Sequence, residues 1–403
     1  MSHAPILFPV DGDDMLIGGM PVRLLAERMG STPFYAYDRA LMSARVTELR
    51  AALPKDVRLH YAMKCNPMPD VVAHFVPIVD GVDVASASEM DVALAAGARH
   101  VSFAGPGKSN DDIERAVAAG IVLNIESERE LRSAVKAGDA LGKTPRLALR
   151  VNPLFELKAS GMKMGGAPSQ FGIDAERAPE VLKEIETSGV SFEGFHIFAG
   201  SQNLRADSLI ETQAKTLKLT MELAAATPMK VKLANIGGGF GIPYAPGDKR
   251  LDIVPIGEAL NVAMEEFRAR MPDTEVAIEL GRYLAGEAGV YVCRVVDKKI
   301  SRGQVFLITD GGLHHHLAAS GNFGQVIRRN YPVVAPGRMA AGERETAHVV
   351  GPLCTPLDLL GAAVDLPKLD VGDLVAVLQS GAYGLTASPT AFLSHPRPGE
   401  IVV

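Results

Sequence analysis

Several apolar runs in this 403-residue sequence end in side chains that could do chemistry. Lys64 closes one run, Arg150 and His196 close two others, and Glu279 closes a fourth. A lysine at the end of an apolar strand is partly desolvated, so its amine is held neutral more easily and can form a Schiff base with a carbonyl compound. The other polar residues or glycines at such ends are Asp83, Ser86, Glu89, Ser201, Arg282 and the glycines at 237–239.

The glycine run IGGGFG at 236–241 could bind a phosphate group, because glycine lets backbone N–H groups approach an anion closely. The run lacks the last glycine of the dinucleotide-binding fingerprint, and no Lys-Ser/Thr follows it as in the ATP-binding P-loop. Ser201 and Arg282 could add donors. A phosphate site, a Schiff-base lysine and an opposed carboxylate, Glu279, together indicate pyridoxal phosphate, whose pyridine nitrogen a carboxylate keeps protonated.

The three cysteines, at 65, 293 and 354, form neither a disulfide framework nor a metal cluster by their spacing. We therefore expect reduced thiols and a cytoplasmic protein. Cys354 lies in GPLCTPLDLL (351–360), and this pattern alone leaves open whether the thiol is a small buried hydrophobe or a reactive group. The HHH run at 314–316 is similar to a metal cluster, but adjacent side chains on a strand point to opposite faces, so we expect no metal site.

The elements that must position these residues alternate in type along the chain. Eight apolar or β-branched runs indicate strands, and helical patterns lie between them. Such alternation predicts parallel βα units, and eight of them within about 250 residues favour a (β/α)8 barrel over the alternative, a doubly wound open sheet. Catalytic residues of a barrel lie at the carboxyl ends of its strands. The expected strands are 58–65, 81–86, 100–105, 121–126, 146–152, 192–200, 232–239 and 275–282.

The domain organisation follows from a change of pattern after Gly286. From there the chain reads as strands joined by turns, such as GVYVCRVVDKKI and DLVAVLQSGAY. We predict a barrel domain over 35–280 and a second, mainly β domain, sandwich-like or barrel-like, formed by 281–403 with a contribution from 1–34. Asn110 and Ser127, each followed by acids, are predicted to cap two barrel helices.

Composition limits the classes of function. The chain is 47% hydrophobic and 22% charged, as globular proteins are, and no apolar run approaches the length of a membrane span. Acids near the amino terminus do not fit a signal peptide. A net charge of −6 argues against nonspecific binding to nucleic acids or membrane surfaces.

A series of motifs extends the pyridoxal phosphate interpretation over most of the chain. In order they are GSTPFYAYD (30–38), YAMKCNP (61–67), DVASASE (83–89), SQFGI (169–173), GSQ (200–202), IGGGFG (236–241), ELGR (279–282), GPLC (351–354) and SGAYG (380–384). With these motifs the chain resembles the pyridoxal-phosphate-dependent decarboxylases of the alanine racemase-like fold, which include the diaminopimelate, ornithine and arginine decarboxylases. It is most similar to the diaminopimelate branch.

The resemblance implies a role for each matching residue. Lys64 would carry the cofactor as a Schiff base, and Glu279 would pair with the pyridine nitrogen, where racemases of this fold carry arginine. Cys354 would lie on a loop from the partner subunit of a homodimer and help to protonate the carbanion left after CO₂ departs. The residues that would bind the phosphate are Ser201, Gly238, Gly239, Gly281, Arg282 and Tyr383. Those that would support Lys64 and the cofactor are Asp83, Glu89 and Arg150.

Two departures from the family pattern bear on the cofactor and the substrate. The family usually stacks a histidine on the cofactor ring, whereas FHIFAGSQ (195–202) places Phe198 there and His196 two residues earlier. Beside the cysteine, relatives carry a glutamate or aspartate that pairs with a distal amino group of the substrate. Here that residue is Thr355, which cannot supply the charge.

Thr355 therefore predicts a substrate whose distal part is neutral, acidic or tethered. Some relatives with CTPLD-like loops are associated with amino acids carried on acyl carrier proteins. Asp358 is a second acid that could replace the missing one. The segment 310–332 adds candidates for substrate contact. Arg328 or Arg329 with Tyr331 is similar to the family's R-x-x-x-Y element, although the spacing differs. The candidates for substrate contact from this comparison are Arg282, Asp310, Arg329 and Tyr331.

The main hypothesis is a homodimeric, pyridoxal-phosphate-dependent amino-acid decarboxylase, a carboxy-lyase. One alternative is an amino-acid racemase on the same fold, which Glu279 and the GPLC motif disfavour. The other is a noncatalytic binding protein of the antizyme-inhibitor type, which the presence of Lys64, Glu279 and Cys354 disfavours.

Overall fold

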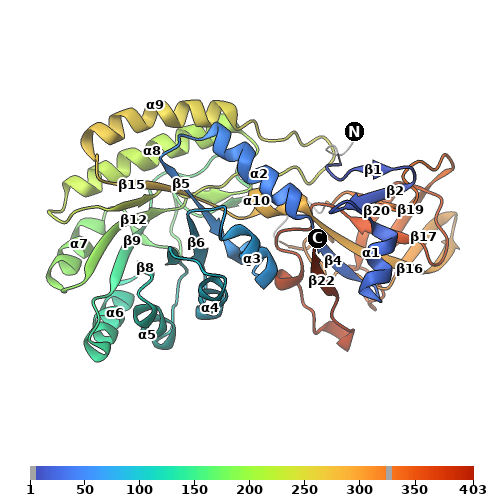
Figure 1. Ribbon diagram of the computed structural model, residues 1–403, viewed down its shortest axis with the longest axis horizontal. Coiled ribbons are helices and arrows are strands. Elements are labelled where there is room, and N and C mark those ends of the chain that lie inside the picture. The colour runs from blue at the N-terminus through green and yellow to red at the C-terminus, as the bar shows by residue number, and fades with distance from the viewer. Residues whose placement is uncertain (1–5, 324–328) are drawn as a thin grey trace. The chain divides into compact units, whose positions relative to one another are not determined.

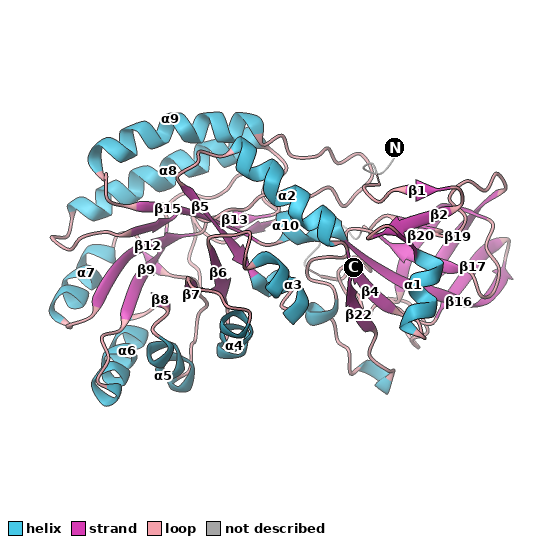
Figure 2. Ribbon diagram, in the orientation of Figure 1, coloured by secondary structure: helices cyan, strands magenta, loops and turns pink. Residues whose placement is uncertain are grey.

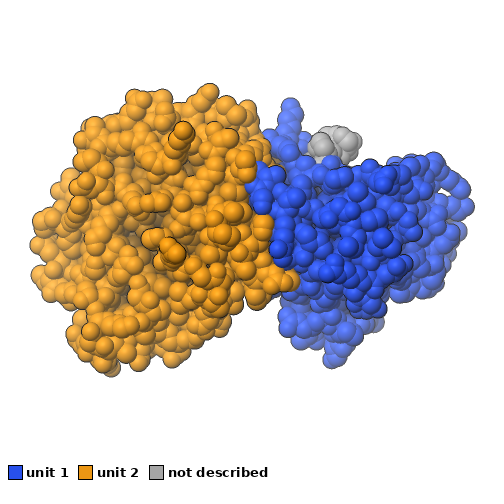
Figure 3. Space-filling view, viewed as in Figure 1, with its two compact units in different colours: residues 1–44, 242–250, 282–403 blue, residues 45–241, 251–281 orange. Residues whose placement is uncertain are grey.

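The computed structural model describes residues 6–323 and 329–403, which form two compact units (Figure 3). Unit 1 comprises Met1–Ala44, Ile242–Arg250 and Arg282–Val403, and unit 2 comprises Arg45–Gly241 and Leu251–Gly281. The predicted domain boundaries near 35 and 280 stay predictions. No sequence signal marked the short segment 242–250, which packs with unit 1 although it lies between two parts of unit 2.

Unit 2 is a closed barrel of parallel strands (Figures 1 and 2). Neighbours in the chain are mostly neighbours in the barrel, and the pairings β15 with β5 and β8 with β9 close the ring. This confirms the predicted (β/α)8 barrel, and every predicted strand overlaps an observed one. The barrel strands are β5 Val57–Ala62, β6 Gly81–Val84, β7 Val101–Phe103, β8 Val122–Ile125, β9 Arg146–Asn152, β12 Ser191–Ile197, β14 Leu233–Asn235 and β15 Glu275–Leu280.

Helices follow the barrel strands along the chain and pack around them (Figure 2). They are α3 Pro69–Phe75, α4 Ala87–Ala95, α5 Asn110–Ala119, α6 Glu128–Leu141, α7 Ala178–Thr187, α8 Ala206–Ala225 and α9 Val254–Arg270, while α2 Arg39–Ala52 passes from unit 1 into unit 2. Short strands complete the unit: β10 Met162–Lys163 pairs with β13 Gly200–Ser201, β11 Ile173–Asp174 pairs with β9, and the 3-10 turn η1 spans Met63–Cys65.

The helix caps agree with the sequence in one case and differ in the other. Ser127 caps α6, because its hydroxyl accepts a hydrogen bond from Glu130 N at 3.3 Å. For α5 the cap is Ser109 rather than Asn110. Ser109 Oγ accepts from Asp112 N, and Asp112 Oδ2 accepts from Ser109 N, both at 3.0 Å. This reciprocal pair satisfies two amides at once, so the helix begins one residue earlier than the pattern suggested.

Unit 1 is mainly β, as predicted for the second domain. Its large sheet runs in the order β18-β21-β16-β17-β19-β20, and β4 pairs with both β16 and β22. The bounds are β4 Phe34–Tyr37, β16 Gly289–Ser301, β17 Gln304–Thr309, β18 Val333–Val334, β19 Arg344–Val350, β20 Leu359–Pro367, β21 Leu374–Val377 and β22 Gly399–Val402. The amino-terminal strand of this sheet is thus β4, which begins at the edge of the predicted 1–34 contribution.

A smaller sheet and short helices complete unit 1. They are β1 Val10–Asp11, β2 Asp14–Ile17, β3 Met20–Pro21, α1 Val22–Met29, α10 Arg282–Ala285 and the 3-10 turns η2 Gly286–Ala288, η3 Leu385–Ala387 and η4 Phe392–Ser394. Apolar residues of β2, α1, β4, β16 and β21 form one core cluster. Among the residues that the structure describes, no helix has the length and apolar character that a membrane crossing requires.

Candidate active site

Lys64 lies just past the carboxyl end of β5. The strand stops at Ala62 and the chain forms the turn η1, so Lys64 stands on a turn rather than in the strand expected over 58–65. Tyr61 holds this turn, because its hydroxyl donates to Asn66 O at 2.8 Å while its ring stacks on Phe75. The amine is exposed, and its Nζ lies 5.6 Å from the centre of the Phe198 ring. A fixed turn therefore presents Lys64 at the barrel mouth beside an aromatic face.

Glu279 is a buried carboxylate near the carboxyl end of β15. Two donors share its Oε2 atom: His196 Nε2 at 2.9 Å and Asn235 Nδ2 at 3.1 Å. Burial raises the pKa of Glu279, but the charge and hydrogen bond of His196, with the charges of Lys64 and Arg150, lower it to about 2. Glu279 is consequently ionised at neutral pH, with its second oxygen, Oε1, not used by these donors.

His196 and Phe198, the two residues considered for stacking on the cofactor ring, have different surroundings. His196 is fully buried against Glu279, and its Nδ1 has no hydrogen-bond partner among the described residues. Phe198, two residues later, lies beside the Lys64 amine. In this arrangement Phe198 presents its ring to the Lys64 amine, and His196 contacts the Glu279 carboxylate.

The glycine run after β14 packs directly on β15. A Cβ atom at Gly238 would lie 2.0 Å from the carbonyl oxygen of Glu279, so only glycine lets the two segments approach this closely. Asn235 ties the run to the carboxylate, since its Oδ1 accepts from Gly237 N at 2.9 Å. Gly239 O accepts from Asn203 N at 2.9 Å, which joins the run to the segment after Ser201.

Asp83 lies in β6 near its carboxyl end, and Glu89 lies in the first turn of α4; each contacts other groups of the protein. Asp83 Oδ1 lies 3.3 Å from His60 Nδ1, whereas Asp83 Oδ2 is buried without a partner among the described residues. Glu89 Oε2 accepts from Ala85 N at 2.7 Å, and burial raises the pKa of Glu89 against this hydrogen bond and the nearby charge of Lys64. Ser86 caps α4 by accepting a hydrogen bond from Glu89 N, and so fixes the start of the helix that carries Glu89.

Arg150 belongs to a buried ionic network that the sequence did not reveal. Its guanidinium donates to Glu126 Oε1 at 2.7 Å and lies 4.9 Å from the centre of the Phe171 ring. Lys108 continues the network, with Nζ 3.0 Å from Glu130 Oε2 and 3.9 Å from Glu126 Oε1. The one available signal was that Glu126 ends the apolar run IVLNIE, as the predicted site residues end theirs.

Unit 1 holds Arg282, the residue that follows Gly281 in the chain, among tyrosines. Its guanidinium donates to the Tyr244 hydroxyl at 2.8 Å and lies 4.6 Å from the centre of the Tyr383 ring, and Tyr331 stacks on Tyr244. Burial lowers the pKa of Arg282, but Tyr244, Tyr331 and Tyr383 raise it above its usual value. Its buried Nε has no partner among the described residues. Tyr244 was not anticipated, because it lies in a loop without a recognised motif.

The remaining predicted substrate contacts are placed as follows. Cys354 is exposed and Thr355 half-buried in the loop between β19 and β20. Asp358 is buried, and its carboxylate accepts from Leu313 N at 2.6 Å and from Leu353 N at 2.9 Å, which argues against the predicted contact of Asp358 with a substrate. Asp310 likewise accepts from the Thr32 hydroxyl and from Arg294 N. Arg329 is exposed, and Arg328 lies outside the described residues.

The histidines at 314–316 are buried on a turn. His315 Nε2 lies 2.8 Å from Pro396 O and His316 Nε2 lies 2.9 Å from Ser380 Oγ. Within the described ranges, no group of three histidine, cysteine, aspartate or glutamate side chains is arranged to hold a metal ion.

The residues present in each of the two units fit a part of pyridoxal phosphate. Unit 2 offers an exposed lysine beside an aromatic ring, an ionised buried carboxylate, a glycine cradle and the unpartnered Asp83 Oδ2. Unit 1 offers a buried guanidinium with an unpartnered Nε, as an anion-binding group should have.

Comparisons with known proteins agree with this chemistry. The family model described as "Pyridoxal-dependent decarboxylase, pyridoxal binding domain" matches residues 39–286. L-glutamyl-[BtrI acyl-carrier protein] decarboxylase of Niallia circulans is 41% identical over 92% of this chain and 88% of its own length. Diaminopimelate decarboxylase of Aquifex aeolicus is 30% identical over 100% of this chain and 93% of its own length.

A solved structure extends the likeness to three dimensions. Diaminopimelate decarboxylase from Helicobacter pylori, complexed with L-lysine, superposes with a TM-score of 0.84 at 25% identity, covering 94% of each chain. The family match and the relatives' activities favour decarboxylation over the racemase and noncatalytic alternatives. The chain belongs to the family of pyridoxal-dependent decarboxylases and is a pyridoxal-phosphate-dependent amino-acid decarboxylase.

Proposed function

We propose that this decarboxylase acts on an amino acid without a distal ammonium group, specifically a glutamyl group carried on an acyl carrier protein. The observation that carries the proposal is the loop 351–358, in which Thr355 follows Cys354 and the only acid, Asp358, is buried against backbone amides. A loop without an available carboxylate gains little from a distal ammonium, since an unpaired buried charge is costly.

The relative from Niallia circulans supports the finer part of the proposal, because its name gives a glutamyl group on a carrier protein as its substrate. A glutamyl group attached through one carboxyl group has lost a negative charge there and has no distal ammonium. Such a substrate matches the polar but uncharged side chain of Thr355.

We assign the residues of unit 2 as follows. When bound, pyridoxal phosphate supplies an electron sink for the electron pair left on the α-carbon as CO₂ departs. Lys64 would hold the cofactor covalently through Nζ, and Phe198 would stack on its ring. Glu279 Oε1 would accept a hydrogen bond from the protonated pyridine nitrogen, while His196 and Asn235 hold Oε2.

The phosphate would be bound by backbone amides and donors near the glycine run. These residues are Ser201, Gly238, Gly239 and Gly281, with Arg282 and Tyr383 from unit 1. A glycine cradle and a guanidinium are both suited to a phosphate group, the first by close backbone approach and the second by charge. Asp83, Glu89 and Arg150 would support Lys64 and the cofactor without touching the substrate.

Cys354 would donate the proton that replaces the lost carboxyl group at the α-carbon. Its loop would come from the partner subunit of a homodimer, so two complete sites would need two chains. A cytoplasmic location completes the proposal.

A substrate screen tests the specificity. We expect CO₂ release from a glutamyl thioester of a carrier protein, and rates at least tenfold lower for free glutamate, diaminopimelate, ornithine, lysine and arginine. Efficient turnover of free diaminopimelate would overturn the interpretation of Thr355. Thr355→Glu should slow the carrier-linked substrate and improve diaminopimelate, while the uncharged control Thr355→Val should not improve it.

A second experiment tests the cofactor assignment. Lys64→Ala should lose the visible absorbance band of the covalently held cofactor together with all decarboxylation. Lys299→Ala, an exposed lysine at the end of β16, is the matched control and should keep both. A covalent cofactor adduct that survives borohydride reduction in Lys64→Ala would contradict the assignment.

A third variant tests the proton donor. Cys354→Ala should keep the cofactor band and lower kcat by about 10²-fold, the usual size of a general-acid contribution. Because Cys293 is a fully buried thiol on β16, Cys293→Ala serves as the control that changes a thiol away from the loop. An unchanged steady-state rate in Cys354→Ala would rule out its role in proton donation.

A further inference from the structure

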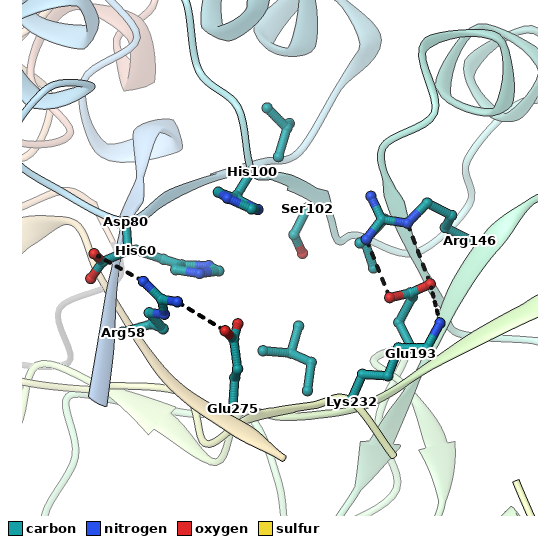
Figure 4. A pocket seen from close by; sticks show the side chains of 12 residues that line it. Arg58, His60, Asp80, His100, Ser102, Arg146, Glu193, Lys232 and Glu275 are labelled. Atoms are coloured by element: carbon teal, nitrogen blue, oxygen red, sulfur yellow. Dashed lines mark hydrogen bonds and ion pairs between the residues drawn. The ribbon is translucent and has the colours of Figure 1, made fainter. Parts of the chain in front are cut away.

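A cavity of about 110 Å³ opens at the amino-terminal end of the barrel, the end opposite to Lys64 and the glycine run (Figure 4). Its rim carries alternating charges from the starts of the strands. Arg58 contacts Glu275 at 2.9 Å and Asp80 at 3.8 Å. Glu193 contacts Arg146 and Lys232, both at 3.2 Å. The rim charges are therefore satisfied by one another and call for no ligand.

His60 is the lining residue that reaches from this cavity into the barrel interior. Figure 4 shows its ring at the cavity, near Arg58 and across from His100 and Ser102. The side chain is 8% exposed, and its Nδ1 lies 3.3 Å from Asp83 Oδ1. Gly81, which is in register with His60, leaves room for the ring, because a Cβ there would lie 2.7 Å from Nε2. The imidazole thus packs over the backbone of β6 with one nitrogen beside Asp83.

Asp83 stands between His60 and the end of the barrel that carries Lys64. It is in register with Ala62, two residues before Lys64. One carboxylate oxygen is used by His60, and the other, Oδ2, is buried without a partner among the described residues. An unsatisfied buried carboxylate oxygen is costly unless a ligand or a nearby cation compensates for it.

We propose that His60 is a positioning residue, which holds Asp83 through Oδ1 and leaves Oδ2 for the cofactor-binding end of the barrel. The cavity gives the buried ring a path to water, through which it gains and loses its proton. This inference rests on the proposed function in one respect, the assignment of Asp83 to cofactor support.

The groups that face His60 favour its charged form. They are Asp83 and Asp80 on the β6 side and Glu279 on β15, opposed by Arg58 on its own strand, while the β7 side presents Ser102 and His100. Burial lowers the pKa of His60, but Asp83, Glu279 and Asp80 raise it above the ordinary histidine value. The stability contributed by the His60 proton is therefore fully present below pH 6.5 and is lost as the pH rises through the raised pKa of His60.

The direct test is an NMR titration of the ring nitrogens in the full-length chain without cofactor, with His60→Gln identifying the His60 signal. We expect the His60 signal to titrate above pH 6.5 and to move to a lower pH in Asp83→Asn. The exposed His100 on the same cavity should show no response to Asp83→Asn. A His60 that titrates at the same pH in Asp83→Asn overturns the proposal, and this outcome does not depend on pyridoxal phosphate.

Cofactor affinity tests the positioning role. His60→Gln, which keeps a neutral donor, should weaken binding of pyridoxal phosphate about tenfold, the size expected when a charged hydrogen-bond partner becomes neutral. His100→Gln should leave binding unchanged. His60→Gln combined with Asp83→Asn should bind no more weakly than Asp83→Asn alone, because His60 acts through Asp83. Additive losses would show that His60 acts elsewhere and would overturn the proposal.

The two sets of measurements separate failure of this inference from failure of the proposed function. If Lys64→Ala keeps a covalent cofactor, the assignment of the site fails while the titration of His60 still tests the His60–Asp83 pair. If the pair couples in the apo chain but His60→Gln binds the cofactor normally, the positioning role fails and the decarboxylase assignment stands. Should His60→Gln fail to fold, a histidine signal that titrates above pH 6.5 in wild type and at a lower pH in Asp83→Asn still shows the pair, and the absence of any such signal overturns it.

Discussion

The two units treat buried ionisable side chains in different ways. In the barrel unit such groups have partners: Arg150 pairs with Glu126 and Lys108 with Glu130, and His196 lies within hydrogen-bond distance of Glu279. In the β unit, burial mostly favours the neutral form instead. It lowers the pKa values of His314, His315 and His316 to about 3, 4 and 3.

This difference shows where the molecule keeps buried side chains ionised. A charge survives burial only when a partner compensates for it, and the barrel supplies partners where the cofactor chemistry is proposed. Arg282 is the informative case in the β unit, because it keeps its charge among tyrosines with no carboxylate in contact among the described residues of that unit. A buried cation of this kind suits an anionic ligand better than it suits the fold alone.

The largest expected effect comes from breaking a barrel pair. Lys108→Met should lower the free energy of unfolding by about 3–5 kcal/mol, because Glu130 would remain buried without its cation. Lys108 Nζ also donates to Gly105 O and Asn124 O, both at 2.7 Å. Urea unfolding followed by circular dichroism measures the change. Lys136→Met, on the exposed face of α6, is the matched control, and an equal small loss in both variants would refute the role of pairing.

Glu279→Gln tests the barrel pair closest to the proposed chemistry. The variant keeps the shape but loses the charge that would face the pyridine nitrogen, so kcat should fall about 10²-fold while the cofactor stays bound through Lys64. Steady-state CO₂ release and the absorbance spectrum measure the two effects. Glu275→Gln, at the exposed start of the same strand, should leave kcat unchanged. A similar kcat for Glu279→Gln would remove Glu279 from the mechanism.

Asp358→Ala asks whether the β unit uses its buried carboxylate to hold the cysteine loop. The carboxylate fills the space beside Gly312 and Gly351, where a Cβ would lie 2.2 Å from its oxygens. Loss of two amide acceptors should cost about 1–3 kcal/mol of unfolding free energy and slow decarboxylation through the loosened Cys354 loop. Asp365→Ala, exposed on β20, is the control. Normal stability in Asp358→Ala would mean that the loop is fixed in another way.

The pH dependence of Asp358 has a definite sign. Burial raises its pKa, although Leu313 N and Leu353 N act against this rise. A carboxyl group whose pKa is higher in the folded state stabilises the fold below its unfolded value near 3.9, and this stabilisation is lost as the pH rises through the folded value. Asp358→Ala should abolish that part of the pH dependence of unfolding.

His316→Phe should give the smallest effect and the clearest contrast with the barrel. Because its pKa is lowered to about 3, His316 is neutral when folded, and unfolding is favoured as the pH falls from 6.5 toward 3 and the unfolded chain binds a proton. The variant loses the hydrogen bonds of His316 with Ser380 Oγ and Ala319 N, about 1 kcal/mol each, so it should be less stable than wild type at pH 7, and this deficit should shrink as the pH falls to 5. Urea unfolding at both pH values, with exposed His100→Phe as control, decides this. Equal acid sensitivity would contradict neutral burial.

The architecture was predictable because the barrel strands are short and apolar, so each of the eight runs was visible on its own. For β9 even the bounds 146–152 agree with the structure. The stop of β5 at Ala62 was not visible, since Met63 and Cys65 are as apolar as the strand itself. Lys64 therefore lies on a turn that the pattern continued as strand.

The candidate site was predictable where residues end strands, and not where distant residues meet. His60 and Asp83 are 23 positions apart and His196 and Glu279 are 83 apart, so only closure of the barrel brings them together. His60 sits inside an apolar run and carries no motif. Asp358 is a different case. Its place near Cys354 suggested a substrate contact, but its carboxylate binds the backbone amides of Leu313 and Leu353, and no side-chain pattern indicates such contacts.

The pairing of β4 with β22 has a consequence for synthesis on the ribosome. Residues 34–37 leave the ribosome early, but their parallel partner at 399–402 is made only after all of residues 38–398. The large sheet of unit 1 cannot be completed until then, whereas the segments of unit 2, 45–241 and 251–281, can pair earlier. The edge of β4 that pairs with β22 stays open through this interval of translation, and a nascent chain halted before residue 399 would expose that edge to chaperones and proteases.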